Sequence, residues 1–258
     1  MILGTALFCD GPLERRALVA RLADGRVADL NRIEQARLRK LGEGQPEGLA
    51  DALVPPSLRR LLEGGPRALQ RAKQTLAYAE KWNQRGDMPL WLAPSVESVA
   101  VVSVKLLPVK LLACIPRPSQ LRRADGTHRD RFQVKGPGAR ISSQPQITLA
   151  VVGGFGDIRG YCLAAEDGET TVLGAWMALD LPTGHLELRA ANHRRSVALD
   201  AWDHLDLPSL RPGEVMLLPP SRLKPFPALE PGARLNLSWP IEEMTLILGD
   251  NLPHPTLQ

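Results

Sequence analysis

The chain has 258 residues, 44% of them hydrophobic, so it can enclose a substantial core as one large domain or as a main domain with a smaller one. Aromatic residues make up only 4% and the formal net charge is a modest +4, which argues against a protein that stacks on nucleic-acid bases. No apolar run reaches the ~18 residues of a membrane span. The chain begins without a basic export signal, and its cysteines stand singly, without metal-site spacing: Cys9, Cys114 and Cys162. We therefore expect a cytoplasmic protein with reduced cysteines that binds neither nucleic acid nor membrane.

The first segments predict strands. An apolar stretch to Phe8 and a second at residues 17–20 have the composition of a strand pair. Residues 27–30 follow the Asp24-Gly25 turn and predict a third strand.

Two helices are predicted next. Ser57 offers an N-cap for a helix that Gly64-Gly65 ends. A longer helix is expected from Pro66 to about Trp82, since its apolar residues fall on one face: Leu69, Ala72, Leu76 and Ala79. Residues 1–95 are thus predicted to form a small α+β region.

From about residue 96 the pattern changes to short β-rich runs separated by Gly and Pro. The runs are Val99–Val104, Lys110–Ile115, Ile147–Val152, Ile158–Ala164, Leu186–Ala190, Val215–Leu218, Leu235–Trp239 and Met244–Leu248. They predict a β-rich domain over residues 96–258, and so a β-dominated α+β protein overall. The glycine-rich residues 153–157 favour a hairpin turn over a phosphate loop, because a strand follows where a phosphate loop needs a helix.

Several short phrases, taken in order, resemble the fumarylacetoacetate hydrolase superfamily over nearly the whole chain. The phrases are Gly25–Leu30, Leu61–Gly64, Pro108–Cys114, Gly160–Ala164, Gly174–Met177, Leu210–Leu217 and Leu229–Gly232. The resemblance implies a mixed β-roll or barrel main domain behind the small N-terminal α+β region. It also implies activity on a 2-oxo acid or β-dicarbonyl compound through a divalent metal, and assembly as a dimer.

At the positions where the family carries metal-binding carboxylates, this chain has different residues. Where that family carries Glu-x-Glu on a strand, this chain has Gln146 and Thr148, which would share one face of the strand as substrate-binding residues. Glu166 or Asp167 falls at the family's third metal carboxylate, although Glu166-Asp167-Gly168 is equally typical of a plain turn. Mg²⁺ needs hard, charged oxygen ligands. We therefore expect no metal cofactor, with Mg²⁺ or Mn²⁺ bound only if the ligand strand lies elsewhere.

The family's His-x-x-Glu dyad is also not intact. His128 is the histidine of the matching loop, and Arg131 stands three residues later, with Asp130 one position short. Together with Lys135, His128 and Asp130 are the candidate catalytic residues. The family's Gly-Thr-Pro turn becomes Leu218-Pro219-Pro220-Ser221.

Without a metal, the positive charge that an anionic substrate needs would come from Lys135, Arg129 and Arg131 of this loop. Arg129 and Arg131 also belong to a local arginine cluster with Arg122 and Arg123. Arg129 and Arg131 are the candidate substrate-binding cations, and a solvated loop is the alternative interpretation of the same cluster.

The sequence leaves an ordinary metal-dependent hydrolase open, with its ligand strand elsewhere, and favours two other functions. The first is a metal-independent enzyme that acts on a small 2-oxo acid or β-dicarbonyl compound by C–C hydrolysis, decarboxylation, hydration or isomerisation. The second is a non-catalytic member of the same fold that binds a small anion or serves as the structural partner of an active paralogue. A homodimer or a heterodimer with a paralogue suits both.

Overall fold

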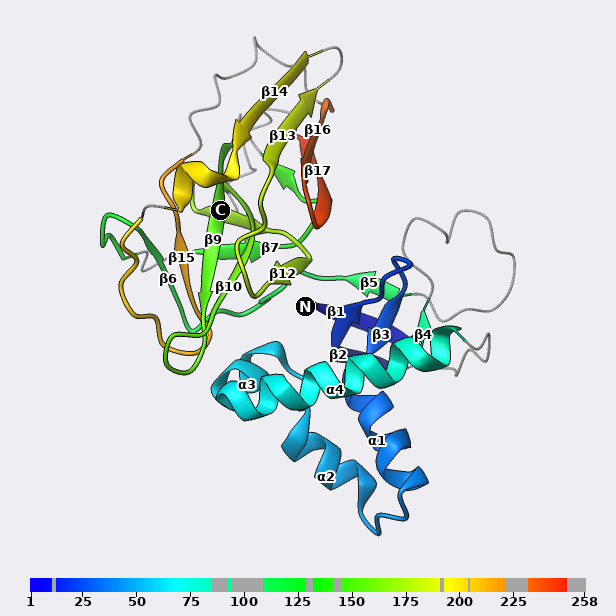
Figure 1. Cartoon of the computed structure of the whole chain (residues 1–258). Coiled ribbons are helices and arrows are strands. Elements are labelled where there is room, and N and C mark those ends of the chain that lie inside the picture. Colours follow the sequence, from blue (N-terminus) through cyan, green and yellow to red (C-terminus); the bar gives the residue numbers. More distant parts are fainter. Residues whose placement is uncertain are drawn as a thin grey trace, which may run out of the picture.

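The computed structural model describes residues 1–10, 13–84, 92–93, 109–128, 132–141, 145–190, 193–203, 205–220 and 232–249 (Figure 1). The helices in these ranges are α1 (Leu30–Lys40), α2 (Pro46–Leu53), α3 (Leu58–Glu63), α4 (Gly65–Gln84) and the short 3₁₀ helix η1 (Leu199–Trp202). The strands are β1 (Ile2–Asp10), β2 (Leu13–Arg21), β3 (Val27–Asp29), β4 (Leu92–Ala93), β5 (Val109–Leu111), β6 (Gln120–Arg123), β7 (Gln133–Lys135), β8 (Arg140–Ile141), β9 (Gln146–Gly153), β10 (Arg159–Asp167), β11 (Thr170–Leu173), β12 (Trp176–Ala178), β13 (His185–Ala190), β14 (His193–Ala198), β15 (Glu214–Leu217), β16 (Arg234–Trp239) and β17 (Glu242–Leu248).

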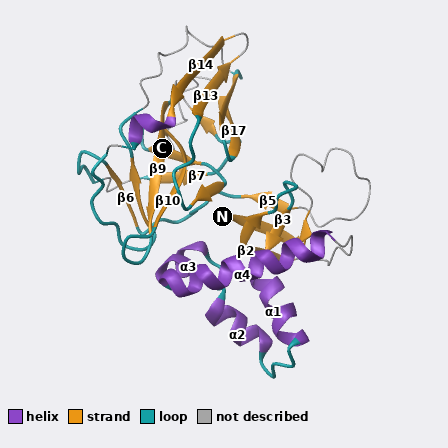
Figure 2. Ribbon diagram, viewed as in Figure 1, coloured by secondary structure: helices purple, strands orange, loops and turns teal. Residues whose placement is uncertain are grey.

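The N-terminal part combines a strand meander with four helices. β1 pairs antiparallel with β2, and β2 with β3, as the apolar runs predict. Figure 2 shows α1–α4 gathered beside these strands. Asp29 ends β3 and caps α1, because its side chain accepts a hydrogen bond from the backbone N–H of Arg32 at 3.1 Å.

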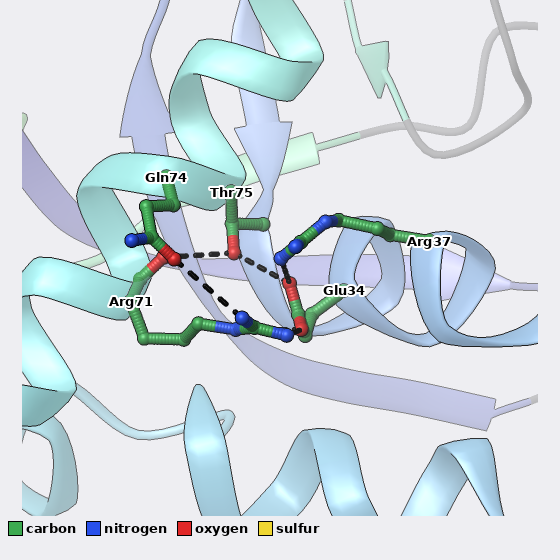
Figure 3. A network of polar contacts seen from close by, with 5 residues as sticks. All are labelled: Glu34, Arg37, Arg71, Gln74 and Thr75. Atoms are coloured by element: carbon green, nitrogen blue, oxygen red, sulfur yellow. Dashed lines mark hydrogen bonds and ion pairs between the residues drawn. The ribbon is translucent and has the colours of Figure 1, made fainter. Parts of the chain in front are cut away.

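A buried polar network joins α1 to α4 (Figure 3). The side chain of Glu34 is fully buried and accepts hydrogen bonds from Arg71 at 2.8 Å and from the hydroxyl of Thr75 at 2.7 Å. Arg37 approaches the same carboxylate at 3.4 Å from the next turn of α1. A buried carboxylate needs such partners, so the network fixes how the two helices pack.

The strands form two sheets, which together make the fold β-dominated. The larger sheet has the order β4-β3-β2-β1-β12-β10-β9-β15-β6, with β5, β7 and β11 attached beside this path. The smaller sheet has the order β14-β13-β16-β17-β8. One buried apolar cluster spans both sheets and includes Leu149, Trp176, Leu186 and Met244. The N-terminal strands therefore continue, through the β1–β12 pairing, into the β-rich part of the chain.

Most predicted elements are present with shifted ends, but the strand expected at Lys110–Ile115 is wrong beyond Leu111, where β5 ends. The predicted hairpin at residues 153–157 connects β9 to β10, which pair antiparallel. α3 ends at Glu63 before Gly64, as predicted. α4 runs from Gly65 to Gln84, one residue earlier and two residues later than the predicted Pro66 to Trp82. The expected strand Val99–Val104 and the expected boundary between residues 95 and 96 lie outside the described residues.

Some strands are absent from the sequence prediction because their residues are polar. β6 is Gln-Leu-Arg-Arg and β14 is mostly exposed, so neither shows an apolar alternation.

Cys114 and Cys162 are free and buried, as expected for core cysteines. The adjacent Cys114 thiol and burial hold the pKa of the Cys162 thiol well above its usual range, which keeps it in the unreactive neutral form. Within the described ranges, no helix has the length and hydropathy needed to cross a bilayer.

Candidate functional site

A cavity of about 290 Å³ lies where β9 and β10 meet the end of β15 and the turn after β6. The described residues that line it are Arg123, Ala124, Asp125, Gln146, Glu166, Leu217, Leu218, Pro219 and Pro220. The cavity therefore forms around Gln146, the first residue of β9, and beside the Leu218-Pro219-Pro220 turn.

The β9–β10 ladder sets the positions of the polar side chains. Gln146 pairs directly with Glu166, and Thr148 pairs with Ala164 two residues along. Residues two apart on a strand point to the same face. Gln146 nevertheless lies exposed at the cavity mouth, whereas Thr148 is fully buried.

Arg123 comes to the same place from the far edge of the sheet. β6 pairs parallel with β15, which in turn pairs with β9, so Arg123 stands beside Leu217 at the cavity wall. Its Nε and Nη2 both lie 3.2 Å from Oε1 of Glu166. The Glu166 side chain is 5% exposed and that of Arg123 is 40% exposed. The pair thus places a buried carboxylate behind a cation that faces the solvent.

A tight turn after β6 completes this wall. The N–H of Gly126 donates to the carbonyl of Arg123 at 3.0 Å, and Gly126 has a φ of 87°, a conformation that favours glycine. The N–H of Thr127 donates to Oδ1 of Asp125 at 2.8 Å. A hydrogen bond from the Thr127 side chain, together with this backbone bond, holds the pKa of the exposed Asp125 carboxyl below its usual range, so Asp125 is ionised at the rim.

The hydroxyl of Thr148 contacts two backbone carbonyls in the cavity wall. It lies 2.9 Å from the carbonyl oxygen of Leu218 and 3.0 Å from that of Pro219. The indole N–H of Trp202 also donates to the Pro219 carbonyl, at 3.2 Å. Thr148 therefore stabilises the Leu218–Pro219 turn, and it is not among the described residues that line the cavity.

The predicted catalytic residues that are described lie away from this cavity. His128 is exposed beyond the turn that follows β6, with Nδ1 2.7 Å from Nε2 of Gln120. Lys135 lies on β7, with Nζ 3.5 Å from the carbonyl of Arg140. Asp130 lies outside the described residues, as do the predicted substrate-binding residues Arg129 and Arg131.

The described residues do not fit a divalent metal. Asp167 is buried beside Glu166 but does not line the cavity. No group of three His, Cys, Asp or Glu side chains in the described parts of the chain has a metal-site arrangement. Glu166 already faces the Arg123 guanidinium, whose charge would repel a dication at the same oxygen. Mg²⁺ takes several hard oxygen ligands, and here Gln146 would offer only a neutral one.

Arg123 is the site residue that the sequence did not single out. It belongs to an arginine cluster for which the sequence favours a solvated loop over an anion site, and its strand has no apolar pattern. Only the parallel pairing of β6 with β15 brings it to Glu166, a contact across 43 residues of sequence.

No family model matches the sequence, and no curated protein matches it either. Among solved structures, the chain is similar to a 2-keto-3-deoxyarabinonate dehydratase, with a TM-score of 0.50 and 9% identity, over 96% of this chain and 99% of that one. It also matches the yeast protein ynq8, described as a fumarylacetoacetate hydrolase family protein, with a TM-score of 0.31 and 12% identity, over 52% of this chain and 84% of that one.

Proposed function

Because the chain has the fumarylacetoacetate hydrolase-like fold, we propose that it is a metal-independent member of that fold, whose cavity binds a small carboxylate through Arg123. The observation that carries the proposal is the Arg123–Glu166 ion pair in the cavity wall. The ligand class is a small 2-oxo acid or β-dicarbonyl anion, which offers one or two charged oxygens to a guanidinium.

Arg123 has the capacity to hold both Glu166 and a ligand. A guanidinium carries five N–H donors in a planar fork, and two of its nitrogens, Nε and Nη2, approach Glu166. The remaining donors can form charge-assisted hydrogen bonds to a carboxylate in the cavity. The Gln146 amide at the mouth adds a neutral donor that does not repel an anion.

Catalysis is the second candidate function, and the same pair is the observation that favours it. Glu166 is the buried carboxylate of the cavity and could accept a proton from a bound oxo acid, while Arg123 would offset the charge of the resulting enolate. Against this, the described candidates His128 and Lys135 do not line the cavity, so acid–base groups there are limited, among described residues, to Glu166 and Asp125.

Calorimetric titration with pyruvate and with oxalate tests binding. Arg123→Gln removes the proposed cation and should weaken binding by roughly tenfold or more. Lys135→Gln removes a charge outside the cavity and should leave binding within about twofold. Equal binding by Arg123→Gln and the wild type would refute the proposal.

Deuterium exchange distinguishes the binder from the enzyme. If the protein only binds, the methyl protons of pyruvate should exchange with D₂O no faster than in protein-free buffer, as followed by proton NMR. Faster exchange that Glu166→Gln abolishes would establish enolisation as an activity of this cavity.

A homodimer or a heterodimer with a paralogue stays a prediction.

A further inference from the structure

A second cavity, of about 280 Å³, lies between β2, α3 and the segment after β5. Its described lining residues are Thr5, Arg16, Pro56, Ser57, Leu58, Arg59, Cys114, Ile115, Pro116 and Arg117. Arg16 comes from β2, Arg59 from α3 and Arg117 from residues 112–119, so the fold brings three arginines from distant segments to one opening.

The described residues that line this cavity include three arginines and no Asp or Glu. Two other cavities differ in this respect: Glu166 and Asp125 line the cavity described above, and Glu242 and Glu243 line one of about 480 Å³. Guanidinium groups gathered at one opening repel each other, and a bound anion would relieve that repulsion.

The side chains of two of these arginines have no partner among the described residues. Arg59 donates from Nε to Glu63 at 2.9 Å along α3. Arg16 and Arg117 are exposed, and neither side chain makes a hydrogen bond or ion pair with another residue in the described part of the chain. Their donors are therefore available to a ligand.

Ser57 adds a hydroxyl at the same opening. It occupies the N-cap position of α3, yet its side chain makes no capping hydrogen bond. Serine is favoured at N-caps because its hydroxyl usually accepts from the helix backbone, so here that hydroxyl is left available as well.

The floor of the cavity is apolar. Leu58 and Ile115 are buried at 2% and 3% exposure, and Cys114 is fully buried below them. The hydroxyl of Thr5 donates to the Cys114 carbonyl at 2.7 Å, and the Cys114 N–H donates to Gly174 at 2.8 Å. The floor's hydrogen-bonding groups are thus paired within the protein, and it presents mainly hydrocarbon to a ligand.

We propose that this cavity binds a small amphiphilic organic acid. Its anionic head, a carboxylate or sulfonate, pairs with Arg16 and Arg117 at the opening, and its apolar body packs on Leu58 and Ile115. A small inorganic anion would make no contact with the apolar floor. An uncharged apolar molecule would make no ion pair with the arginines. This site is separate from Arg123 and does not depend on the function proposed there.

Fluorescence titration with anilinonaphthalene sulfonate, a sulfonate on an aromatic body, tests the proposal on the full chain. The Arg16→Gln/Arg117→Gln double variant should raise the dissociation constant at least about tenfold. Both side chains are exposed and unpaired, so the variant should melt at the wild-type temperature. Arg60→Gln, an exposed arginine of α3 outside the lining, is the matched control and should bind within about twofold.

Competition then tests the shape of the ligand. Octanoate should displace the probe at concentrations where inorganic phosphate does not, because only octanoate has an apolar body. Arg123→Gln should leave probe binding unchanged, which separates this site from the first cavity. Wild-type binding by the double variant, or displacement by phosphate as effective as that by octanoate, would overturn the proposal.

Discussion

Nη2 of Arg123 lies 3.2 Å from Oε1 of Glu166, at the place in the sheet where Glu166 faces Gln146 across the β9–β10 ladder. A cation of the protein therefore stands beside the buried carboxylate of the cavity. Because Gln146 and Thr148 are neutral, Glu166 is left as a single carboxylate paired with a guanidinium, which has little affinity for a dication.

Thr148→Val should destabilise the cavity wall. Valine keeps the shape of the side chain but leaves the carbonyls of Leu218 and Pro219 without this hydroxyl, at a cost of about 1–2 kcal/mol in the free energy of unfolding. Urea denaturation measures the change.

Thr171→Val is the matched control, since Thr171 is equally buried on β11, which pairs with β10 on the side opposite β9. Its hydroxyl has no hydrogen-bond partner in the described structure. Valine there should be neutral or stabilising by up to about 1 kcal/mol. Equal effects of the two substitutions would contradict the role given to Thr148.

Glu242→Gln should change the pH dependence of stability. Burial raises the pKa of Glu242 to about 8 from 4.5, and the backbone N–H of Ala175 donates to its Oε1. The unfolded side chain ionises near 4.5 while the folded one keeps its proton up to about 8. Unfolding therefore releases a proton in this window, and the free energy of unfolding falls as pH rises, by roughly 1.4 kcal/mol per pH unit from this group.

Glutamine does not ionise, so Glu242→Gln should gain stability relative to the wild type as pH rises from 5 to 8. Thermal unfolding across this pH range measures the difference. The control is Glu243→Gln, an exposed neighbour on β17. Parallel pH profiles of the wild type and Glu242→Gln would show that Glu242 is ionised in the folded protein.

Glu34→Ala should weaken the packing of α1 against α4 and lower the free energy of unfolding. The carboxylate is fully buried and bonded to Arg71 and Thr75 (Figure 3), so its removal should cost about 3 kcal/mol. Glu43→Ala, at an exposed position after α1, should stay within about 0.5 kcal/mol. Chemical denaturation provides the comparison, and a double-mutant cycle with Arg71→Ala should show strong coupling.

Gly153→Ala should strain the end of β9. A Cβ there would lie 2.4 Å from Cβ of Leu210 and 2.5 Å from the carbonyl oxygen of Arg211, so backbone must move, at about 2–3 kcal/mol. Gly44→Ala meets no atom within 4 Å and should change stability by less than about 0.5 kcal/mol. A wild-type melting temperature for Gly153→Ala would show that this crowding is absent.

The sequence predicted several elements whose apolar residues repeat with a clear period, although it did not predict α1 and α2. β9, β10 and α4 combine such periods with end signals, and all are present. β6 and β14 are stabilised instead by pairing with neighbouring strands, which leaves no local pattern in their residues. The resemblance to short family phrases supplied the fold where periodicity alone indicated only a β-rich protein.

The site was less predictable than the fold. Strand alternation placed Gln146 at the cavity, but it could not show that the Thr148 hydroxyl turns to the Leu218 and Pro219 carbonyls. Loop position suggested His128 and Lys135, yet neither lines the cavity, since the turn after β6 and the β7–β11 pairing direct them elsewhere. Arg123 depends on sheet register across distant segments, which a single sequence does not encode in any short motif.

The most direct test of the account is calorimetric titration of oxalate into the protein, once with EDTA and once with Mn²⁺, together with Mn²⁺ alone. If Arg123 supplies the positive charge, oxalate should bind equally well in both conditions, and Mn²⁺ alone should give no binding heat. Micromolar Mn²⁺ binding that oxalate strengthens, with no oxalate binding in EDTA, would contradict the account and show that the cavity is a metal site.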